Sequence, residues 1–112
     1  TKEYKIFTMN HKDIIHTIKQ EKDFLKRKYN ISEIGLFGSF AREENTKNSD
    51  IDLLVEFSTN PDLFTYIEII NYLKKKLKRK VDLVTEEALR PEIKKQIMSE
   101  VIYLWKGICY CF

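Results

Sequence analysis

Two cysteines, two prolines, three glycines and two histidines are all that this chain of 112 residues contains of these types. Cys109 and Cys111 form a Cys-x-Cys pair near the C-terminal end, a spacing at which neighbouring cysteines rarely bridge. Without further cysteines or clustered histidines, the pair does not supply the four ligands of a structural zinc site. We therefore expect neither a disulfide nor a zinc centre, and we interpret both cysteines as small apolar residues.

The sequence also lacks long apolar segments. No run approaches the 18 or more apolar residues of a membrane-spanning helix, and the first residues, Thr1 to Tyr4, are polar and charged rather than those of a signal peptide. There are no repeats and no low-complexity linker. With 43% hydrophobic residues, we expect one cytoplasmic domain over residues 1–112, with a modest core and no contact with a membrane.

Positive charge is concentrated in one place. The net charge is only +3, but residues 74–80 contain six basic side chains in seven positions. This run is interpreted either as the solvated C-terminal end of a helix, where cations complement the macrodipole, or as an attraction for phosphates, an acidic partner or RNA. No aromatic residue interrupts it as in a base-stacking surface, so we expect no specific nucleic-acid ligand.

Helical and strand patterns alternate along the chain. Asn10, with Asp13 three residues later, predicts the start of one helix whose apolar stripe continues to Tyr29 and ends at Asn30. Pro61 predicts the first position of a second long helix. The remaining expected elements are strands at 34–37, 51–57, 81–84 and 101–105, a short helix at 86–89 and a helix at 91–99. This order predicts a two-layer α/β domain.

The most informative stretch contains Gly38-Ser39 and, ten residues later, Asp50-Ile51-Asp52. Two aspartates two residues apart on a strand project from the same face, roughly 6–7 Å apart. Such carboxylates repel each other unless a cation lies between them, and Mg²⁺ is commonly bound by one or two carboxylates together with substrate phosphates. An Asp-x-Asp alone often marks only a solvated strand edge. Here it follows an apolar strand, a Gly-Ser turn and a helix-like segment at 40–44, which together favour a metal-dependent nucleotide site.

This combination resembles a known family. The pattern Gly38-Ser39-x10-Asp50-x-Asp52, within GLFGSFAREENTKNSDIDLLVEF, is similar to the signature of the DNA polymerase β-like nucleotidyltransferase superfamily, and most of all to its minimal nucleotidyltransferase branch of MntA-type antitoxins. The resemblance implies an α/β (α+β) fold with a small mixed sheet and helices packed mainly on one face.

The resemblance also implies roles for acidic residues. Asp50 and Asp52 would bridge two Mg²⁺ ions, and a third acidic residue on a later strand would complete the catalytic triad. Asp82, which interrupts the apolar run at 81–84, matches that position and would take the proton of the attacking hydroxyl. Asp82 can also simply face solvent or pair with a nearby lysine. Alternative third carboxylates close in the sequence are Glu56, Glu86 and Glu87.

A phosphate-binding turn is implied at Gly38-Ser39. A glycine allows the backbone to approach the triphosphate closely, and Ser39, at the start of the short helix expected at 40–44, would offer its hydroxyl and N–H groups. Arg42 would reach the same phosphates, although a salt bridge to Glu43 or another carboxylate is an equal alternative. Relatives often have a glycine soon after this arginine, where Glu43-Glu44 stands here.

Function follows from the resemblance alone. It implies a protein adenylyltransferase that uses ATP and Mg²⁺ to transfer AMP to a tyrosine of a HEPN-domain ribonuclease toxin, and so acts as the antitoxin of a pair. A small-molecule nucleotidyltransferase and a non-catalytic antitoxin remain alternatives. A domain of this size has no second lobe to hold an acceptor, so a partner is expected to supply it. Aromatic residues that would dock a partner are Tyr103, Trp105, Tyr110 and Phe112, although for Tyr103 and Trp105 we favour a final strand that packs into the core.

Overall fold

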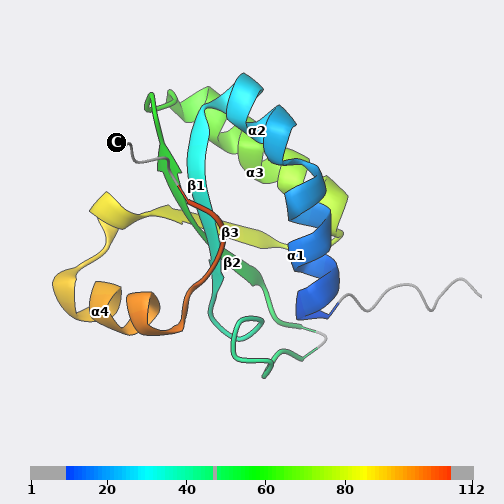
Figure 1. The fold of residues 1–112 in the computed structure, drawn as a ribbon, viewed down its shortest axis with the longest axis vertical. Helices are drawn as coiled ribbons and strands as arrows, with labels where there is room; N and C mark the ends of the chain where they lie inside the picture. The colour runs from blue at the N-terminus through cyan, green and yellow to red at the C-terminus, as the bar shows by residue number, and fades with distance from the viewer. Residues whose placement is uncertain (1–9, 47, 107–112) are drawn as a thin grey trace, which may run out of the picture.

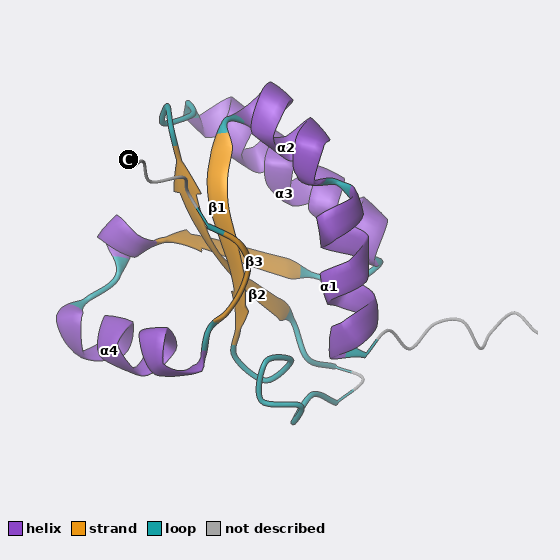
Figure 2. Ribbon diagram, in the orientation of Figure 1, coloured by secondary structure: helices purple, strands orange, loops and turns teal. Residues whose placement is uncertain are grey.

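A four-stranded mixed sheet forms the centre of the computed structural model, which describes residues 10–46 and 48–106 (Figure 1). Helices α1, α2 and α3 cover one face of the sheet, and α4 lies apart from them (Figure 2). The strands are β1 (Ile31–Phe37), β2 (Ile51–Phe57), β3 (Val81–Thr85) and β4 (Ile102–Trp105). The helices are α1 (His11–Gln20), α2 (Lys22–Tyr29), α3 (Leu63–Leu77), a short 3-10 helix η2 (Glu86–Ala88) and α4 (Pro91–Glu100). The expected fold class is confirmed.

Strand order determines which residues meet. The order is β3-β2-β1-β4, in which β1 is antiparallel to both β2 and β4, whereas β2 and β3 are parallel and joined through α3. Phe37, at the end of β1, pairs with Asp52, and Asp52 pairs on its other side with Asp82. The end of β1 therefore lies beside the beginnings of β2 and β3.

The two faces of the sheet differ because side chains alternate along each strand. On β2, Ile51, Leu53 and Val55 belong to the main core, and all three are fully buried. Asp52 and Glu56 project from the opposite face. The core is completed by residues of the three helices and the other strands, including Ile14, Ile18, Leu25, Tyr29, Ile69, Leu73, Leu77, Ile34, Leu36, Leu83 and Leu104.

The first helical segment confirms its predicted cap but not its predicted continuity. Asn10 and Asp13 form the expected capping box, with reciprocal N–H to side-chain hydrogen bonds of 3.0 and 3.1 Å. The prediction of one helix to Tyr29 is wrong, because Glu21 adopts ψ near 4° and separates α1 from α2. Its N–H bonds to the carbonyl of Ile18, a tighter turn than an α-helix makes. Asn30 ends α2 in the left-handed conformation, with φ of 58°.

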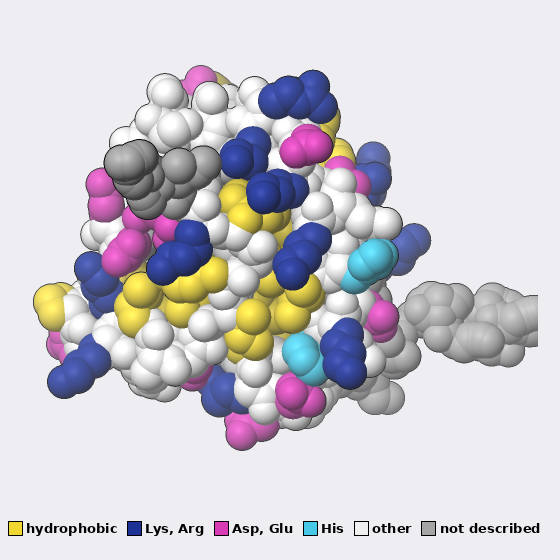
Figure 3. All heavy atoms as spheres, viewed as in Figure 1, with side chains coloured by type: hydrophobic (Ala, Val, Ile, Leu, Met, Phe, Trp, Pro, Cys, Tyr) yellow, Lys and Arg dark blue, Asp and Glu magenta, His cyan; other side chains and the backbone are white. Residues whose placement is uncertain are grey.

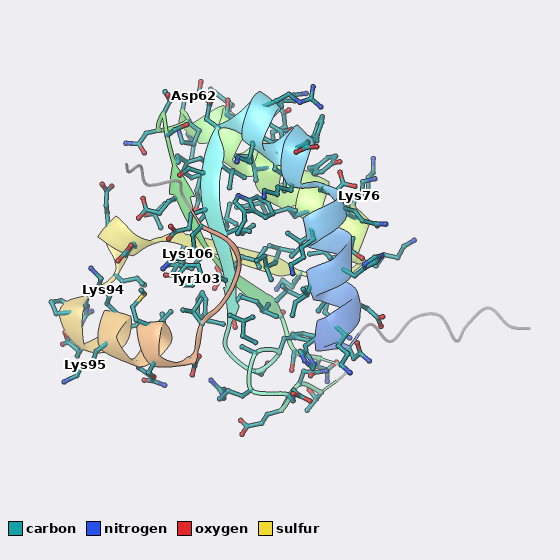
Figure 4. All side chains as sticks on the ribbon, in the orientation of Figure 1. Asp62, Lys76, Lys94, Lys95, Tyr103 and Lys106 are labelled. Carbon is teal, nitrogen blue, oxygen red and sulfur yellow. The ribbon has the colours of Figure 1, made fainter. Side chains whose placement is uncertain are left out.

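Helix α3 begins two residues later than predicted. Asp62, not Pro61, ends the preceding extended segment and caps the helix, since its carboxylate accepts the N–H of Thr65 at 2.8 Å. Asp62 and Lys76 mark the two ends of this helix in Figure 4. At the other end Lys78 takes φ of 55° and closes the helix. The last predicted helix runs as expected from Pro91, to Glu100.

The final strand contributes to both faces. Trp105 and Leu104 are buried in the core, as the core interpretation of this segment requires. Tyr103 is half-buried, and the ammonium of Lys106 lies 4.5 Å from its ring centre (Figure 4). Cys109, Cys111, Tyr110 and Phe112 lie outside the described residues.

The described helices are too short or too polar to cross a bilayer. On the face shown in Figure 3, lysine and arginine side chains are interspersed with acidic side chains and small hydrophobic patches.

Candidate active site

The two strand aspartates predicted for the site lie side by side. Asp52 of β2 and Asp82 of β3 are direct partners in the parallel register, so their side chains project from the same face of the sheet. Asp50 lies just before β2 and is exposed, as Asp82 is, whereas Asp52 is half-buried. Burial, the charge of Asp82 and the charge of Asp50 raise the pKa of Asp52 from 3.8 to about 6, against a lowering effect of Arg42. The structure therefore brings the predicted carboxylates into one electrostatic cluster.

Gly38 packs directly onto this cluster. Its φ is 79°, a left-handed conformation that favours glycine. A Cβ atom at Gly38 would lie 2.2 Å from Oδ2 of Asp52. The following Phe40 is fully buried in the core and anchors the turn. Only glycine therefore lets the chain leave β1 and pass so close to the Asp52 carboxylate.

The segment at 40–44 is a pair of turns, not the short helix that the sequence predicts. The N–H of Arg42 bonds to the carbonyl of Gly38 at 3.1 Å, but the next N–H, of Glu43, bonds to Phe40 at 3.2 Å instead of continuing the α-helical pattern. Glu43 adopts φ of 59°, which ends any helix. No helix N-terminus is therefore available here to bind phosphate.

Glu43 occupies a conformation that suits glycine. Its left-handed backbone lies one residue after Arg42, in the region where the resembled family often has a glycine. The loop keeps a glycine-like shape although its residue is glutamate, at a backbone cost of order 1 kcal/mol. The side chain of Glu43 lies 3.6 Å from Nε2 of His11.

Ser39 retains its hydrogen-bonding capacity. Its carbonyl accepts the N–H of Glu44 at 2.8 Å. Its hydroxyl and N–H have no hydrogen-bond partner among residues 10–46 and 48–106. These two donors, directly after the glycine that touches Asp52, are the groups of the turn that can receive an anion.

Arg42 forms salt bridges with two carboxylates. Its Nε donates to Glu44 at 3.0 Å, and its Nη1 donates to both oxygens of Glu100 at 3.1 Å. Hydrogen bonds to Glu44 and then to Glu100 raise the pKa of the guanidinium above its ordinary value. The salt-bridge alternative for Arg42 is thus observed, with Glu44 and Glu100 as partners rather than Glu43.

Glu100 is the residue of this region that sequence reasoning missed. It is the last residue of α4, and its Oε2 accepts the N–H of Gly38 at 2.9 Å. It also contributes to the raised pKa of Asp52. No motif marks it, because its contacts are with residues 58 and 62 positions earlier in the chain.

The end of the basic run supports the loop before Asp50. Nη1 of Arg79 donates to the carbonyl of Ser49 at 2.9 Å, and its guanidinium lies 5.2 Å from the ring centre of Phe40. The N–H of Ile51 bonds to the carbonyl of Lys80 at 2.9 Å. Lys74, Lys75 and Lys76 lie in the last turn of α3, as the macrodipole interpretation expects. The run is therefore partly structural.

Glu56 and Glu86 form a separate acidic pair. Burial, followed by the neighbouring Glu86 carboxyl, raises the pKa of Glu56. Glu56 lies four residues beyond Asp52 on β2, or about 13 Å along the strand. Lys94 of α4 neutralises Glu86 at 3.2 Å. Asp82 is the nearer neighbour of Asp52.

A hollow of about 480 Å³ lies at the opposite ends of β2 and β3 from Asp52 and Asp82. Its lining includes Phe57, Tyr66 and Leu83 and the alternative carboxylate Glu87, but none of Gly38, Ser39, Arg42, Asp50, Asp52 and Asp82. The carboxylate cluster is therefore an open part of the surface, separate from this hollow.

The donor atoms of the carboxylate cluster suit a divalent cation. Among the described residues, no group of three or more histidine, cysteine, aspartate or glutamate side chains is already arranged around a single metal position. Yet Asp52 is half-buried beside two like charges, and burial followed by those charges raises its pKa. A cation with a preference for oxygen ligands would relieve the repulsion among these charges. Asp50, Asp52 and Asp82 are thus the residues that would hold one.

The fold and this arrangement define a nucleotidyltransferase. The Nucleotidyltransferase domain family matches residues 18–104, and the chain belongs to this family. A Methanocaldococcus jannaschii protein, provisionally named protein adenylyltransferase MJ1379, is 44% identical over 95 residues, which cover 82% of this chain and 95% of that protein. Protein adenylyltransferase MntA of Thermococcus cleftensis is 40% identical over 80 residues, 71% of this chain and 81% of MntA.

Solved structures agree with this assignment. A provisionally assigned minimal nucleotidyltransferase superposes with a TM-score of 0.72 at 28% identity, over 86% of this chain and 97% of the other. A chain from a toxin–antitoxin crystal structure with AMP-PNP superposes with a TM-score of 0.66 at 26% identity, over 80% of this chain and 73% of that one. The family membership predicted from Gly38-Ser39 and Asp50-x-Asp52 is confirmed.

Proposed function

We propose that this nucleotidyltransferase transfers AMP from ATP to a hydroxyl group of a partner protein, a tyrosine of a HEPN-family ribonuclease toxin, and so acts as an antitoxin. The observation that carries the proposal is the register of Asp52 beside Asp82, with Gly38 packed on the Asp52 carboxylate. This places a turn with free donors next to a carboxylate cluster, as transfer from a triphosphate requires.

The relatives support the choice of a protein as acceptor. Relatives that are 40 to 46% identical over about four-fifths of this chain are provisionally named protein adenylyltransferases. The toxin–antitoxin structure with AMP-PNP combines an ATP analogue with a toxin partner in a neighbour that has the same fold. A second neighbour of 26% identity comes from the MntA-HpeT toxin–antitoxin pair, in a variant in which one tyrosine is replaced by alanine.

Transfer of AMP forms one bond to the α-phosphorus of ATP and breaks another. The tyrosine oxygen of the acceptor attacks the α-phosphorus of ATP, the bond between the α-phosphorus and the bridging oxygen breaks, and pyrophosphate leaves with that oxygen. The phenolic proton passes to a carboxylate, for which Asp82 is the exposed candidate beside Asp52. The Ser39 hydroxyl and N–H would hold the outer phosphates, so that the α-phosphorus remains close to the carboxylates.

Asp50, Asp52 and Asp82 would hold magnesium. When bound, the divalent ion supplies charge neutralisation of the triphosphate and stabilisation of the attacking and leaving oxygens. The chain's own part is to keep three carboxylates close enough to influence one another before substrate arrives, as the pKa of Asp52, raised to about 6, indicates.

The partner is proposed to supply the acceptor. Residues 1–112 are proposed to form one catalytic domain. This domain is proposed to act in the cytoplasm, where ATP and the toxin meet. The exposed positions of Asp50 and Asp82 leave the cluster open to a side chain from outside.

A labelling experiment tests the proposal. The chain is incubated with [α-³²P]ATP, Mg²⁺ and a HEPN-family toxin from the same organism, and labelled partner is followed on gels and by mass spectrometry. Wild type should label a tyrosine, whereas Asp52→Asn should lose at least about a hundredfold in rate, since a charge that stabilises the transition state is removed. Asp23→Asn, an exposed carboxylate on α2, is the matched control and should label normally.

Two results would contradict the proposal. If wild type leaves the partner unlabelled but still blocks its toxicity, the chain is a non-catalytic antitoxin. If label appears on small hydroxylated compounds and not on the partner, the enzyme modifies small molecules.

A further inference from the structure

Glu100 connects the last turn of α4 to the turn that follows β1, from Gly38 to Arg42. Its carboxylate accepts the N–H of Gly38 at 2.9 Å through Oε2 and contacts Nη1 of Arg42 at 3.1 Å through both oxygens. The turn is itself closed by the Arg42 N–H, which bonds to the Gly38 carbonyl. One side chain therefore holds both ends of the turn.

The contact of Glu100 with Gly38 is partly buried and reaches the carboxylate cluster, whereas its contacts with Arg42 are exposed. The Glu100 side chain is 16% exposed, compared with 66% for Glu44, the other carboxylate bound to Arg42. Gly38 is buried, and its Cα lies against Asp52 so tightly that a Cβ would clash. A buried N–H without an acceptor costs free energy, so the position of Gly38 on Asp52 depends on the acceptor that Glu100 provides.

We propose that Glu100 is a positioning residue of the nucleotide site, which holds the Gly38 turn against Asp52 so that the Ser39 donors receive the triphosphate. The inference rests on the proposed nucleotide-dependent function. The positioning depends on the length of the Glu100 side chain and not on its charge, because hydrogen bonds to both Gly38 and Arg42 need a side chain of this length at the end of α4.

Charge alone would give Glu100 the opposite effect. A carboxylate near Asp52 adds negative potential where a polyanion would bind, and Glu100 does raise the pKa of Asp52. If Glu100 acted as an anion that competes with phosphate for Gly38 and Arg42, its neutralisation would tighten nucleotide binding. The Ser39 hydroxyl and N–H, which have no partner in the described part of the chain, favour positioning because they leave donors for the nucleotide while Glu100 keeps Gly38.

Two variants distinguish the effect of the length of the Glu100 side chain from the effect of its charge. Glu100→Gln keeps the length and an amide oxygen that can accept from Gly38, but it removes the charge. Glu100→Asp keeps the charge but is shorter by one methylene, so it cannot bridge Gly38 and Arg42 together. Glu44→Gln is the matched control, because Glu44 also binds Arg42 but does not touch Gly38.

The experiment measures the dissociation constant of AMP-PNP with Mg²⁺ for the full chain by calorimetry, and the exchange rate of the Gly38 amide proton by NMR without nucleotide. Glu100→Asp should weaken binding about tenfold and speed exchange at Gly38, as expected for loss of hydrogen bonds to a charged group. Glu100→Gln should stay within about threefold of wild type, because its amide oxygen can still accept the Gly38 N–H, although the bond is weaker without the charge. Glu44→Gln should match wild type in both measurements.

Several results would overturn the inference. Tighter binding by Glu100→Gln, with Glu100→Asp equal to wild type, would make Glu100 a competitor of phosphate. Equal binding by all variants, or faster exchange at Gly38 without weaker binding, would leave Glu100 only a structural role. If wild type binds no AMP-PNP, the proposed function fails. If exchange at Gly38 is unchanged in Glu100→Asp, Glu100 does not hold the Gly38 turn, and the inference fails separately from the proposed function.

Discussion

The two faces of strand β2 have different roles, since one packs into the core and the other carries the carboxylates. Ile51, Leu53 and Val55 face the three helices and are fully buried. Asp52 and Glu56 face the other side, and the pKa of each carboxyl is raised, first of all by burial. The same seven-residue strand thus stabilises the fold on one face and gathers repelling charges on the other. The repulsion among the site carboxylates lowers the stability of the fold, and burial of the core side chains offsets this cost.

Removal of a core side chain on β2 should have the largest effect. Leu53→Ala deletes a fully buried side chain and should lower the free energy of unfolding by about 3 kcal/mol, because it loses burial and leaves a cavity. Urea denaturation followed by circular dichroism measures this. A loss below about 1 kcal/mol would show that the helix-covered face is not the source of stability.

A methyl group on Gly38 should lower both the stability of the fold and the affinity for nucleotide. Gly38→Ala places a Cβ 2.2 Å from Oδ2 of Asp52 at a φ of 79°, so the free energy of unfolding should fall by about 2 kcal/mol. Nucleotide affinity should fall with it, because the turn must move away from the carboxylates. Gly35→Ala is no neutral control, since its Cβ would lie 2.5 Å from Val101. Thr59→Ala, at an exposed position after β2, serves instead. Unchanged stability and affinity in Gly38→Ala would contradict the close packing.

Neutralisation of Asp52 should abolish transfer but stabilise the fold. The pKa of Asp52 is about 6 in the folded chain and 3.8 in its ordinary state, so the folded chain binds the proton more tightly. The stability linked to that proton is fully present below pH 4 and is lost as the pH rises through about 6. With solvent screening considered, Asp52→Asn should be more stable than wild type by about 1 kcal/mol at pH 7 in EDTA.

Thermal and urea unfolding of both chains from pH 4 to pH 8 measure this difference. It should increase between about pH 4 and pH 6 and then stay constant. A wild type that is the more stable chain at pH 7, or a difference independent of pH, would show that Asp52 is not in a repulsive environment.

Glycine at position 43 should give the smallest effect. Glu43→Gly removes the left-handed strain at φ of 59° but gives the unfolded chain more freedom, so the free energy of unfolding should rise by only about 0.5 kcal/mol or stay equal. Chemical denaturation at high precision measures it. A loss above about 1 kcal/mol would mean that the 3.6 Å contact of Glu43 with His11 stabilises the turn.

Local patterns predicted much of the fold. Alternation along β2, the capping box of Asn10 and the proline at the first position of α4 are short-range signals, and the corresponding elements lie where they were expected. Apart from the start of α3, which lies two residues later than predicted, the wrong predictions concern helices that were expected to be continuous. The break at Glu21 and the turns after Gly38 arise where packing onto the sheet redirects a chain whose local sequence favours a helix.

The site was predictable in part for the same reason. Gly38 and Asp52 belong to one short motif, and Asp82 follows from the order of strands, so their proximity could be expected. Glu100 and Arg79 could not be found in this way, because each contacts the site across a long sequence separation through an ordinary side chain. Only the folded chain shows that α4 ends where a carboxylate meets Gly38.

The pKa of Asp52, measured by ¹³C NMR titration of its side chain in wild type and in Asp82→Asn, tests the central claim most directly. We expect a value of about 6 in metal-free wild type, a lower value in Asp82→Asn because a neighbouring charge is removed, and a lower value in wild type with Mg²⁺ and AMP-PNP. An ordinary value near 4 that neither the substitution nor the ligands change would contradict a shared carboxylate site on the open face of the sheet.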